Sequence, residues 1–228
     1  MENWSISWSR IASGKAESRV LGPEFYSRDT LEVARELLGK ILIVRSNPKQ
    51  PFDDPKSRVT AGRIVETEAY RGGDPASHSS RGETPRTTVM FGEPGVAYVY
   101  FIYGMYEMLN FVTEPKGQPG AVLIRAIEPV SGEALMLKRR KVRTRRDLTC
   151  GPGRLCVALG IERRHNGQSL QGPSLFVADD GFKPARISIS KRVGIRSGTE
   201  KDWRYFVSDN EFVSRVRENA GSRIWKGA

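Results

Sequence analysis

Two glutamates and a group of tyrosines between residues 63 and 110 are the first candidates for chemistry. This segment begins Arg-Ile-Val-Glu-Thr-Glu-Ala-Tyr and ends Tyr-Val-Tyr-Phe-Ile-Tyr-Gly-Met-Tyr-Glu-Met-Leu-Asn. If residues 59–70 form a strand, its period of two places Glu66, Glu68 and Tyr70 on one face. A cavity lined by tyrosine rings and holding one or two acids suits a flat, electron-poor guest.

Each of these residues also has a structural interpretation. A pair of glutamates on a strand is usually solvated or salt-bridged, and tyrosine is common in sheets. His78 lies in an expected loop, where a surface or structural role is the more frequent one. Tyr103 is different, because a ring beside Gly104 at a hairpin tip has little core to pack against. Such a ring could insert between base pairs, as apolar wedges do in minor-groove binders.

The overall composition favours a nucleic-acid partner. A net charge of +11 and a pI near 9.9 are typical of nucleic-acid-binding domains, with an anionic membrane surface or simple solubility as the alternatives. No apolar run approaches the length of a bilayer span, and the N-terminus lacks a secretion signal. The only cysteines, Cys150 and Cys156, fit a reducing compartment. We therefore expect an intracellular protein, in the cytoplasm of a bacterium or the nucleus of a eukaryote, that is a monomer and does not bind membranes.

Several basic residues are candidates for phosphate contact: Arg86, Arg139, Arg140 and Arg154. The basic run at 138–146 is by default a solvated helix end, and phosphate contact is the competing interpretation. The expected helix start at 151–154 combines free backbone amides with a basic residue, which is a weak phosphate signal on its own. No metal-binding pattern such as HExxH or paired Cys and His occurs, so we expect no metal and no cofactor.

The elements that position these residues are expected to form a single α+β domain. Residues 1–20 are interpreted as a polar, mobile extension, and residues 21–228 as the folded domain. Hydrophobic periodicity and capping signals predict helices after Asp29, near Pro85 and at 131–141, 151–155 and 211–217. Strands are predicted at 40–45, 59–70, 96–102, 107–112, 121–127, 174–178, 185–189 and 203–207. Their hairpin-like succession indicates a mainly antiparallel sheet. Arg125 lies inside the apolar 121–127 strand and therefore requires an anionic partner nearby.

Together these motifs resemble the alkyladenine family of 3-methyladenine DNA glycosylases, which are monofunctional base-excision enzymes. The matching blocks occur in family order at 62–70, 76–78, 84–86, 98–106 with Asn110, 120–129, 151–155 and 192–194. One block would be only suggestive, whereas the ordered series is specific. The resemblance implies a compact domain with a curved, mainly antiparallel sheet flanked by helices, similar to the C-terminal domain of formyltransferases. The loop at 46–57 is long for the family, and residues 195–206 are shorter than its usual run.

The resemblance also implies catalytic roles for individual residues. Glu68 is implied as the general base that activates a water molecule for attack on the sugar C1′. Arg125 and the backbone carbonyl of Val193 are implied near that water. No catalytic lysine is needed, which implies simple hydrolysis that leaves an abasic site.

A second set of implied roles concerns the damaged base and the duplex. Three ring side chains would wall the pocket for a flipped base: Tyr70, His78 and Tyr100. Asn110 would crowd the 2-amino group of guanine and so exclude the normal base. Tyr103, with Met105 beside it, would fill the gap that the flipped nucleotide leaves in the duplex.

The expected function is therefore a DNA glycosylase that acts on alkylated, and by extension deaminated, purines in double-stranded DNA. The competing interpretation is a non-catalytic module that binds nucleic acid through a basic surface and stacking tyrosines. An RNA-binding domain is a third and weaker interpretation, because it rests on fold analogy alone.

Overall fold

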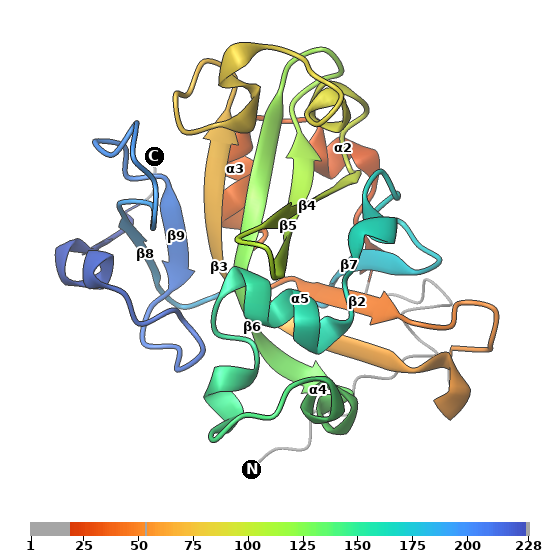
Figure 1. Ribbon diagram of the computed structural model, residues 1–228. Helices are drawn as coiled ribbons and strands as arrows, with labels where there is room; N and C mark the ends of the chain where they lie inside the picture. Colours follow the sequence, from red (N-terminus) through yellow and green to blue (C-terminus); the bar gives the residue numbers. More distant parts are fainter. Residues whose placement is uncertain (1–18, 53, 227–228) are drawn as a thin grey trace.

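The computed structural model describes residues 19–52 and 54–226 (Figure 1). The extension expected at residues 1–20 lies outside the described residues, apart from Arg19 and Val20, which form the short strand β1 (Arg19–Val20). Four helices occur in the described part of the chain: α2 (Pro23–Tyr26), α3 (Thr30–Glu36), α4 (Glu133–Arg139) and α5 (Pro152–Leu159). Single 3₁₀ turns are also present: η1 (Pro55–Ser57), η2 (His78–Arg81), η3 (Thr88–Phe91), η4 (Arg145–Leu148), η5 (Arg163–His165) and η6 (Arg217–Gly221).

One sheet of ten strands organises the domain. After β1, its strands are β2 (Ile41–Arg45), β3 (Val59–Arg71), β4 (Ala97–Ile102), β5 (Tyr106–Thr113), β6 (Gly120–Ser131), β7 (Leu175–Asp179), β8 (Ile187–Ser190), β9 (Arg204–Val207) and β10 (Arg223–Ile224). Every pair of strands among the described residues is antiparallel. The predicted α+β class with a mainly antiparallel sheet is therefore confirmed.

Strand β3 is the branch point of the sheet. The main path runs β1-β7-β2-β3-β6-β5-β4, and β9 with β8 and β10 attaches to β3 from the side. The first part of β3 pairs with β2 and its second part, from Glu66 to Glu68, pairs with β9. Register shifts against β6 occur on both sides of Glu66, so a β-bulge lies where β3 changes neighbour. Bulges bend a strand and redirect its side chains, and they are frequent next to active sites.

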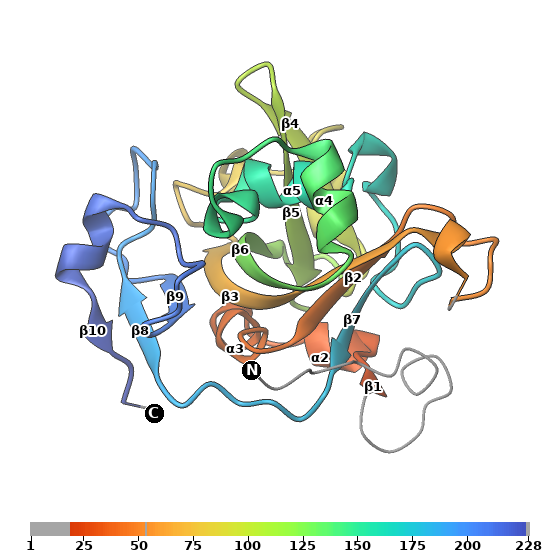
Figure 2. The same cartoon turned by 90° about the horizontal axis from the view of Figure 1, so that it is seen from below.

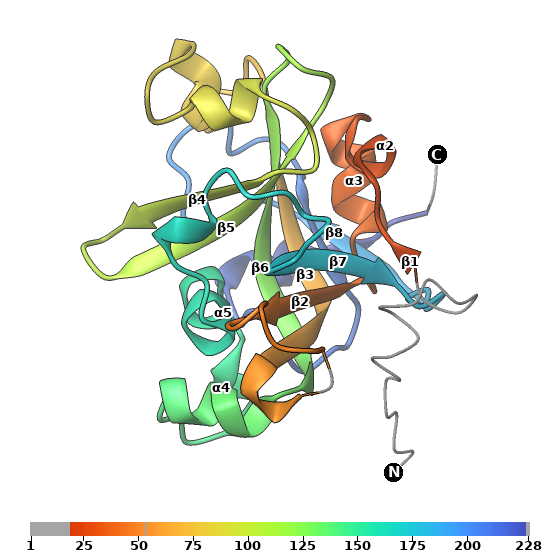
Figure 3. The same ribbon diagram turned by 90° about the vertical axis from the view of Figure 1, so that its right-hand side faces the viewer.

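The helices cover opposite sides of the long central strands. Figures 2 and 3 show α2 and α3 on one side of β3 and β6, and α4 and α5 on the other. The largest core cluster joins Val33 of α3 and Leu155 of α5 with Ile64 and Ile124 from the sheet. The predicted central position of the 121–127 strand is confirmed, because β6 lies between β3 and β5.

Local signals placed several elements correctly. Asp29 caps α3 by accepting hydrogen bonds from the backbone N–H groups of Leu31 and Glu32, at 2.8 and 3.2 Å. The hairpin tip predicted at 103–105 connects β4 to β5, with Ile102 paired to Tyr106. In Figures 2 and 3 this hairpin extends beyond the body of the domain.

Two predicted helices are wrong. Around Pro85 the chain makes a turn, in which Thr84 and Thr87 exchange side-chain to backbone hydrogen bonds, and only the 3₁₀ turn η3 follows. At 211–217 the backbone N–H groups of Phe212 and Ser214 donate to the side chains of Asn210 and Glu66. Because these donors are bonded to side chains, they do not form the backbone ladder of a helix.

Candidate active site

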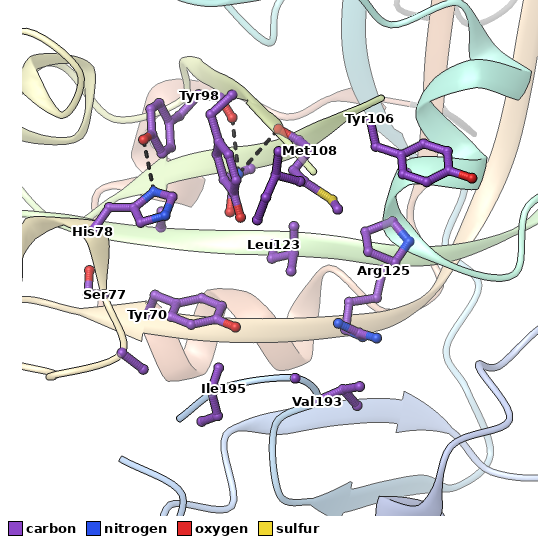
Figure 4. A pocket seen from close by; sticks show the side chains of 18 of the residues that line it. Tyr70, Ser77, His78, Tyr98, Tyr106, Met108, Leu123, Arg125, Val193 and Ile195 are labelled. Carbon is purple, nitrogen blue, oxygen red and sulfur yellow. Dashed lines mark hydrogen bonds between the residues drawn. The ribbon is translucent and has the colours of Figure 1, made fainter. Parts of the chain in front are cut away.

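A cleft of about 670 Å³ opens beside the second half of β3. Its lining comes from β3, β4, β5 and β6, from the start of α5, and from the loops at 75–78 and 193–197. Figure 4 shows Tyr70 on one side of this cleft, His78 and Tyr98 on the other, and Arg125 and Val193 at the same end as the hydroxyl of Tyr70. The fold thus brings together side chains from four strands and two loops that are widely separated in the sequence.

Glu68 is fully buried immediately behind the wall of the cleft. Its Oε2 accepts a hydrogen bond from the hydroxyl of Tyr70 at 2.7 Å, and its Oε1 accepts one from the backbone N–H of Val193 at 2.7 Å. Arg125 Nη1 lies 3.3 Å from Oε1. Each of these three neighbours lines the cleft. All of them are donors, which is the environment that an ionised carboxylate requires when it is removed from water.

Tyr70 remains a hydrogen-bond donor because its pKa is raised well above the ordinary value. Burial is the largest cause, and the charge of Glu68 together with the hydrogen bond to Glu68 adds to it. The predicted position of Tyr70 on the same face as Glu68 is confirmed by this contact. For Val193 the structure places the backbone N–H, rather than the carbonyl, against Glu68, and the carbonyl's contact with water stays a prediction.

The loop that carries Val193 is attached to the sheet through Arg192. The guanidinium of Arg192 is buried, donates to the carbonyl of Ala69 at 2.9 Å and forms an ion pair with Asp74. It also lies over the ring of Tyr70, 4.6 Å from its centroid, and this contact packs the ring in place. Burial acts to raise the pKa of Asp74, but the hydrogen bond and charge of Arg192 outweigh it, so that pKa is lowered.

Glu66 forms a second buried network behind the site. Its Oε1 accepts from Arg125 Nε at 2.9 Å and from Arg204 Nε at 2.7 Å, and its Oε2 accepts from the backbone N–H of Ser214 at 2.8 Å. Burial acts to raise the pKa of Glu66, but the charges of Arg125 and Arg204 and the bond from Ser214 outweigh it and lower that pKa. The anionic partner that the sequence requires for Arg125 is therefore two carboxylates, which raise the pKa of its guanidinium although burial opposes this.

The opposite wall of the cleft consists of three packed rings: His78, Tyr98 and Tyr100. The His78 and Tyr100 centroids are 4.5 Å apart at 71°, and the Tyr98 and Tyr100 centroids are 5.4 Å apart. The Nδ1 atom of His78 and the hydroxyl of Tyr98 share a hydrogen bond of 3.0 Å. Burial, assisted by the charge of Arg86, lowers the pKa of His78 to about 4, so this ring is neutral at pH 7.

The alternation of the strand places Tyr98 on the same face as Tyr100, but the sequence analysis assigned it no place in the pocket wall. In the structure Tyr98 lines the cleft and holds His78. Asn110 is buried at the base of the same hairpin, and its Nδ2 donates to the backbone carbonyl of Tyr98 at 3.1 Å. This bond fixes the orientation of the amide at the edge of the cleft.

The tip of the β4–β5 hairpin exposes three large apolar side chains: Phe101 at 53%, Tyr103 at 73% and Met105 at 64%. Tyr103 and Tyr106 also line the cleft, so the tip borders its opening. The backbone of Tyr103 has φ of +56°, a left-handed conformation that is unfavourable for a bulky side chain. Residues in strained backbone conformations cluster at functional sites.

The predicted phosphate contacts divide into two groups. Arg154 lines the cleft, and the guanidinium of Arg86 lies over the ring of Tyr100 at 5.4 Å from its centroid. Arg139 instead bonds to the carbonyl of Ala158 and the hydroxyl of Ser46, and Arg140 bonds to the carbonyl of Asp147. These last two side chains are thus half-buried and tie helices to loops. Arg196, which the sequence did not single out, is exposed and lines the cleft.

Two further findings bear on binding partners. Within residues 19–52 and 54–226, no group of three or more His, Cys, Asp and Glu side chains could hold a metal ion. In the same part of the chain, no helix has the length and apolar character needed to cross a bilayer.

Comparisons with known proteins place this architecture among its relatives. The family model described as methylpurine-DNA glycosylase (MPG) matches residues 24–211. A protein of Prosthecochloris aestuarii (strain DSM 271 / SK 413) is 47% identical over 196 residues, covering 85% of this chain and 90% of its own. One of Desulfitobacterium hafniense (strain Y51) is 45% identical over 207 residues, with coverages of 85% and 98%. One of Methanocella arvoryzae (strain DSM 22066 / NBRC 105507 / MRE50) is 46% identical over 201 residues, with coverages of 86% and 96%. All three carry the name "Putative 3-methyladenine DNA glycosylase".

Proposed function

The chain belongs to the methylpurine-DNA glycosylase family, and from this membership we propose that it excises alkylated and deaminated purines from duplex DNA through a water molecule activated by Glu68. Membership of this family makes the protein a DNA N-glycosylase, a hydrolase that acts on damaged DNA in base-excision repair. The range of lesions and the roles of individual residues are the parts that we propose.

The observation that carries this proposal is the environment of Glu68. A fully buried carboxylate lies directly behind an aromatic-lined cleft, and the three groups that contact it among residues 19–52 and 54–226 are donors. Its two oxygens accept three such contacts, which leaves acceptor capacity for a water molecule on the cleft side. A carboxylate held in this way suits both deprotonation of water and stabilisation of a positively charged sugar.

We propose the following course for the reaction. The damaged nucleotide rotates out of the duplex, its base enters the cleft, and the exposed ring of Tyr103 takes the vacated space. The base then stacks between Tyr70 on one side and His78 with Tyr100 on the other. Water loses a proton to Glu68 while its oxygen bonds to C1′ of the sugar. The bond from C1′ to the base nitrogen breaks, and the base leaves with the electron pair, so that an abasic site remains.

The aromatic walls of the cleft fit cationic as well as neutral bases. Alkylation at a ring nitrogen often gives a purine a positive charge, which weakens its pairing and makes it a good leaving group. Tyrosine rings attract such a cation, and the neutral state of His78 at pH 7 adds no opposing charge to the wall. Asn110, fixed by its bond to Tyr98, is proposed to exclude the 2-amino group of normal guanine.

Replacing Glu68 with glutamine tests the proposal. We expect Glu68→Gln to abolish base release from a methylated duplex under single-turnover conditions, while its affinity for that duplex stays close to wild type. Glu93→Gln, a change of the same chemistry at an exposed site, serves as the matched control. Full activity of the Glu68 variant would contradict the role assigned to this residue.

The same assay addresses the alternative of a non-catalytic binding module. Duplexes that carry 3-methyladenine, 7-methylguanine, hypoxanthine or ethenoadenine are incubated with the protein and then treated with alkali. Strand cleavage at the lesion reports an abasic site and identifies the lesions that are substrates. Tight binding without cleavage at any of these bases would favour the module.

A further inference from the structure

Arg125 is shared between two buried glutamates that lie two residues apart on β3. Its Nε atom lies 2.9 Å from Glu66 Oε1, and its Nη1 atom lies 3.3 Å from Glu68 Oε1. Both carboxylates have no exposed surface, and the arginine side chain is only 7% exposed. The Nε atom of the guanidinium therefore binds Glu66, and its Nη1 atom lies beside Glu68. Arg125 also lines the cleft.

Glu66 is itself held by residues that do not line the cleft. Arg204 on β9 donates to Oε1 at 2.7 Å and to the hydroxyl of Ser190 at 2.9 Å, and the backbone N–H of Ser214 donates to Oε2 at 2.8 Å. The β-bulge of β3 also lies at Glu66. These contacts determine where the carboxylate of Glu66 lies, and through it the position of Arg125.

The division of Arg125 between two carboxylates has a chemical consequence. An arginine beside a single carboxylate prefers to bind both oxygens at once, with two parallel hydrogen bonds. Such a pair would occupy the oxygen lone pairs of Glu68 that a water molecule needs. It would also stabilise the ionised form of Glu68 and weaken it as a base. Because Glu66 binds Nε, Arg125 makes only one longer contact with Glu68.

We propose that Glu66 is a positioning residue for base excision. By binding Nε of Arg125, it limits Arg125 to one contact with Glu68, so that Glu68 keeps a free acceptor for water. This inference rests on the proposed function of Glu68. Glu66 is fully buried, and its partners Arg204 and Ser214 do not line the cleft, whereas Tyr70, Val193 and Arg125 around Glu68 all do. Among its partners, Arg125 is the one that lines the cleft and connects it to Glu68.

The charges around Glu68 determine the sign of the expected pH effect. Tyr70 from β3 and Arg125 from β6 contact it directly, and Glu66 shares Arg125 with it. Tyr100 of β4 lies within range of its charge, Arg192 lies over the ring of Tyr70, and Arg204 of β9 is its register partner. Of these, Glu66 is the only other carboxylate. Removing its charge takes the carboxylate from Arg204 and leaves Glu68 as the one carboxylate bound to Arg125, so the acidic limb of the pH–rate profile should move to lower pH.

The test is the pH dependence of single-turnover base release by Glu66→Gln. We expect the acidic limb to move down by about 1 pH unit and the rate on the plateau to fall on the order of tenfold. Affinity for lesion-containing duplex should stay close to wild type, because Glu66 does not border the cleft. Arg204→Lys is the charge-conserving comparison: it alters how Glu66 is held but keeps the positive charge beside it, so its acidic limb should stay in place while its plateau falls.

A plateau and an acidic limb that both match wild type would overturn the inference. The inference would also be overturned if Glu66→Gln and Arg204→Lys lost the same amount of rate and neither variant showed a moved acidic limb. That result would indicate a structural role only. If Glu66→Gln does not fold, Glu66→Asp tests the inference instead. This variant keeps the charge but shortens the side chain, so the plateau rate should fall while the acidic limb stays in place. A wild-type plateau in Glu66→Asp would refute the positioning role.

Glu68→Gln, measured in parallel, separates this inference from the function on which it rests. An active Glu68→Gln enzyme would overturn the proposed function and the inference with it. An inactive Glu68→Gln enzyme beside a Glu66→Gln enzyme of wild-type profile would overturn the role of Glu66 alone.

Discussion

Replacing Tyr70 with phenylalanine would remove one hydroxyl from the site and leave the stacking ring in place. In the native protein this hydroxyl donates to Glu68 Oε2 at 2.7 Å, and it is the only donor that contacts this oxygen among the described residues. The ring of Tyr70 is also held from behind by Arg192, a contact that phenylalanine retains. The substitution therefore isolates one hydrogen bond to the proposed base.

The size of the effect follows from the strength of that bond. A hydrogen bond to a charged group contributes about 1.5–3 kcal/mol, and one pH unit corresponds to about 1.4 kcal/mol. Losing this donor leaves the negative charge in the site less well stabilised, so the acidic limb of the pH–rate profile should move to higher pH by about 1–2 pH units. Water entering from the cleft would replace part of the bond, which favours the lower end of this range.

Single-turnover release of a methylated base, measured from about pH 5 to about pH 8.5, follows the position of this limb. On the acidic limb, Tyr70→Phe should lose about tenfold in rate for each pH unit by which the limb moves, while its rate above the limb should be equal to or higher than wild type. Tyr98→Phe is the matched control, because its hydroxyl bonds to His78 on the opposite wall and not to Glu68. Lesion affinity should change little in both variants, since both keep their rings.

The reasoning is refuted if the acidic limb of Tyr70→Phe coincides with that of Tyr98→Phe, or if it moves to lower pH. Either result would mean that the hydroxyl of Tyr70 does not control the ionisation on which the reaction depends. The acidic limb is expected to move to lower pH in Glu66→Gln and to higher pH in Tyr70→Phe. A general loss of stability cannot produce shifts in opposite directions, so the two variants control for each other.

Three further predictions concern the surroundings of the site. Asp74→Asn leaves Arg192 buried without its anionic partner, so the free energy of unfolding measured in urea should fall by about 3–5 kcal/mol. The exposed control Asp209→Asn should change it by less than about 1 kcal/mol. Tyr103→Gly relieves the left-handed backbone, so its Tm should equal or exceed wild type while its affinity for lesion duplex falls; unchanged affinity would exclude the wedge role. His78 has a folded-state pKa of about 4 against 6.5 when unfolded, so the stability it contributes is present above pH 6.5 and is lost as the pH falls toward 4. NMR of its imidazole should show a neutral ring at about pH 6, and a protonation midpoint near 6.5 would contradict this.

Local patterns in the sequence were sufficient for the elements that carry the site. Alternation along 59–70 placed Glu68 and Tyr70 on one face, and Tyr103 beside Gly104 marked the hairpin tip. These features depend on residues a few positions apart, where strand period and turn chemistry act. The same local reasoning failed at 211–217, because Glu66 of β3 captures a backbone donor there from 148 residues away.

Such patterns could not predict which residues pair with one another in the buried networks. The apolar strand around Arg125 showed that a buried cation needs an anion, but not that two glutamates share it. Arg204, which completes the network, gave no signal, because its contact with Glu66 exists only through the pairing of β9 with β3. Tyr98 likewise acquires its role from the loop that brings His78 to it.

By itself, the sequence determined the family, the strands and turns, and the presence of buried charge among tyrosines, because these follow from motifs and short-range periodicity. Only the tertiary structure decided which oxygen meets which nitrogen. Arg125 and Glu66 are 59 residues apart, and Glu68 and Val193 are 125 apart. Contacts of that kind depend on sheet register, on the bulge at Glu66 and on the path of the 191–203 loop, and a one-residue slip in register would turn these side chains to the other face.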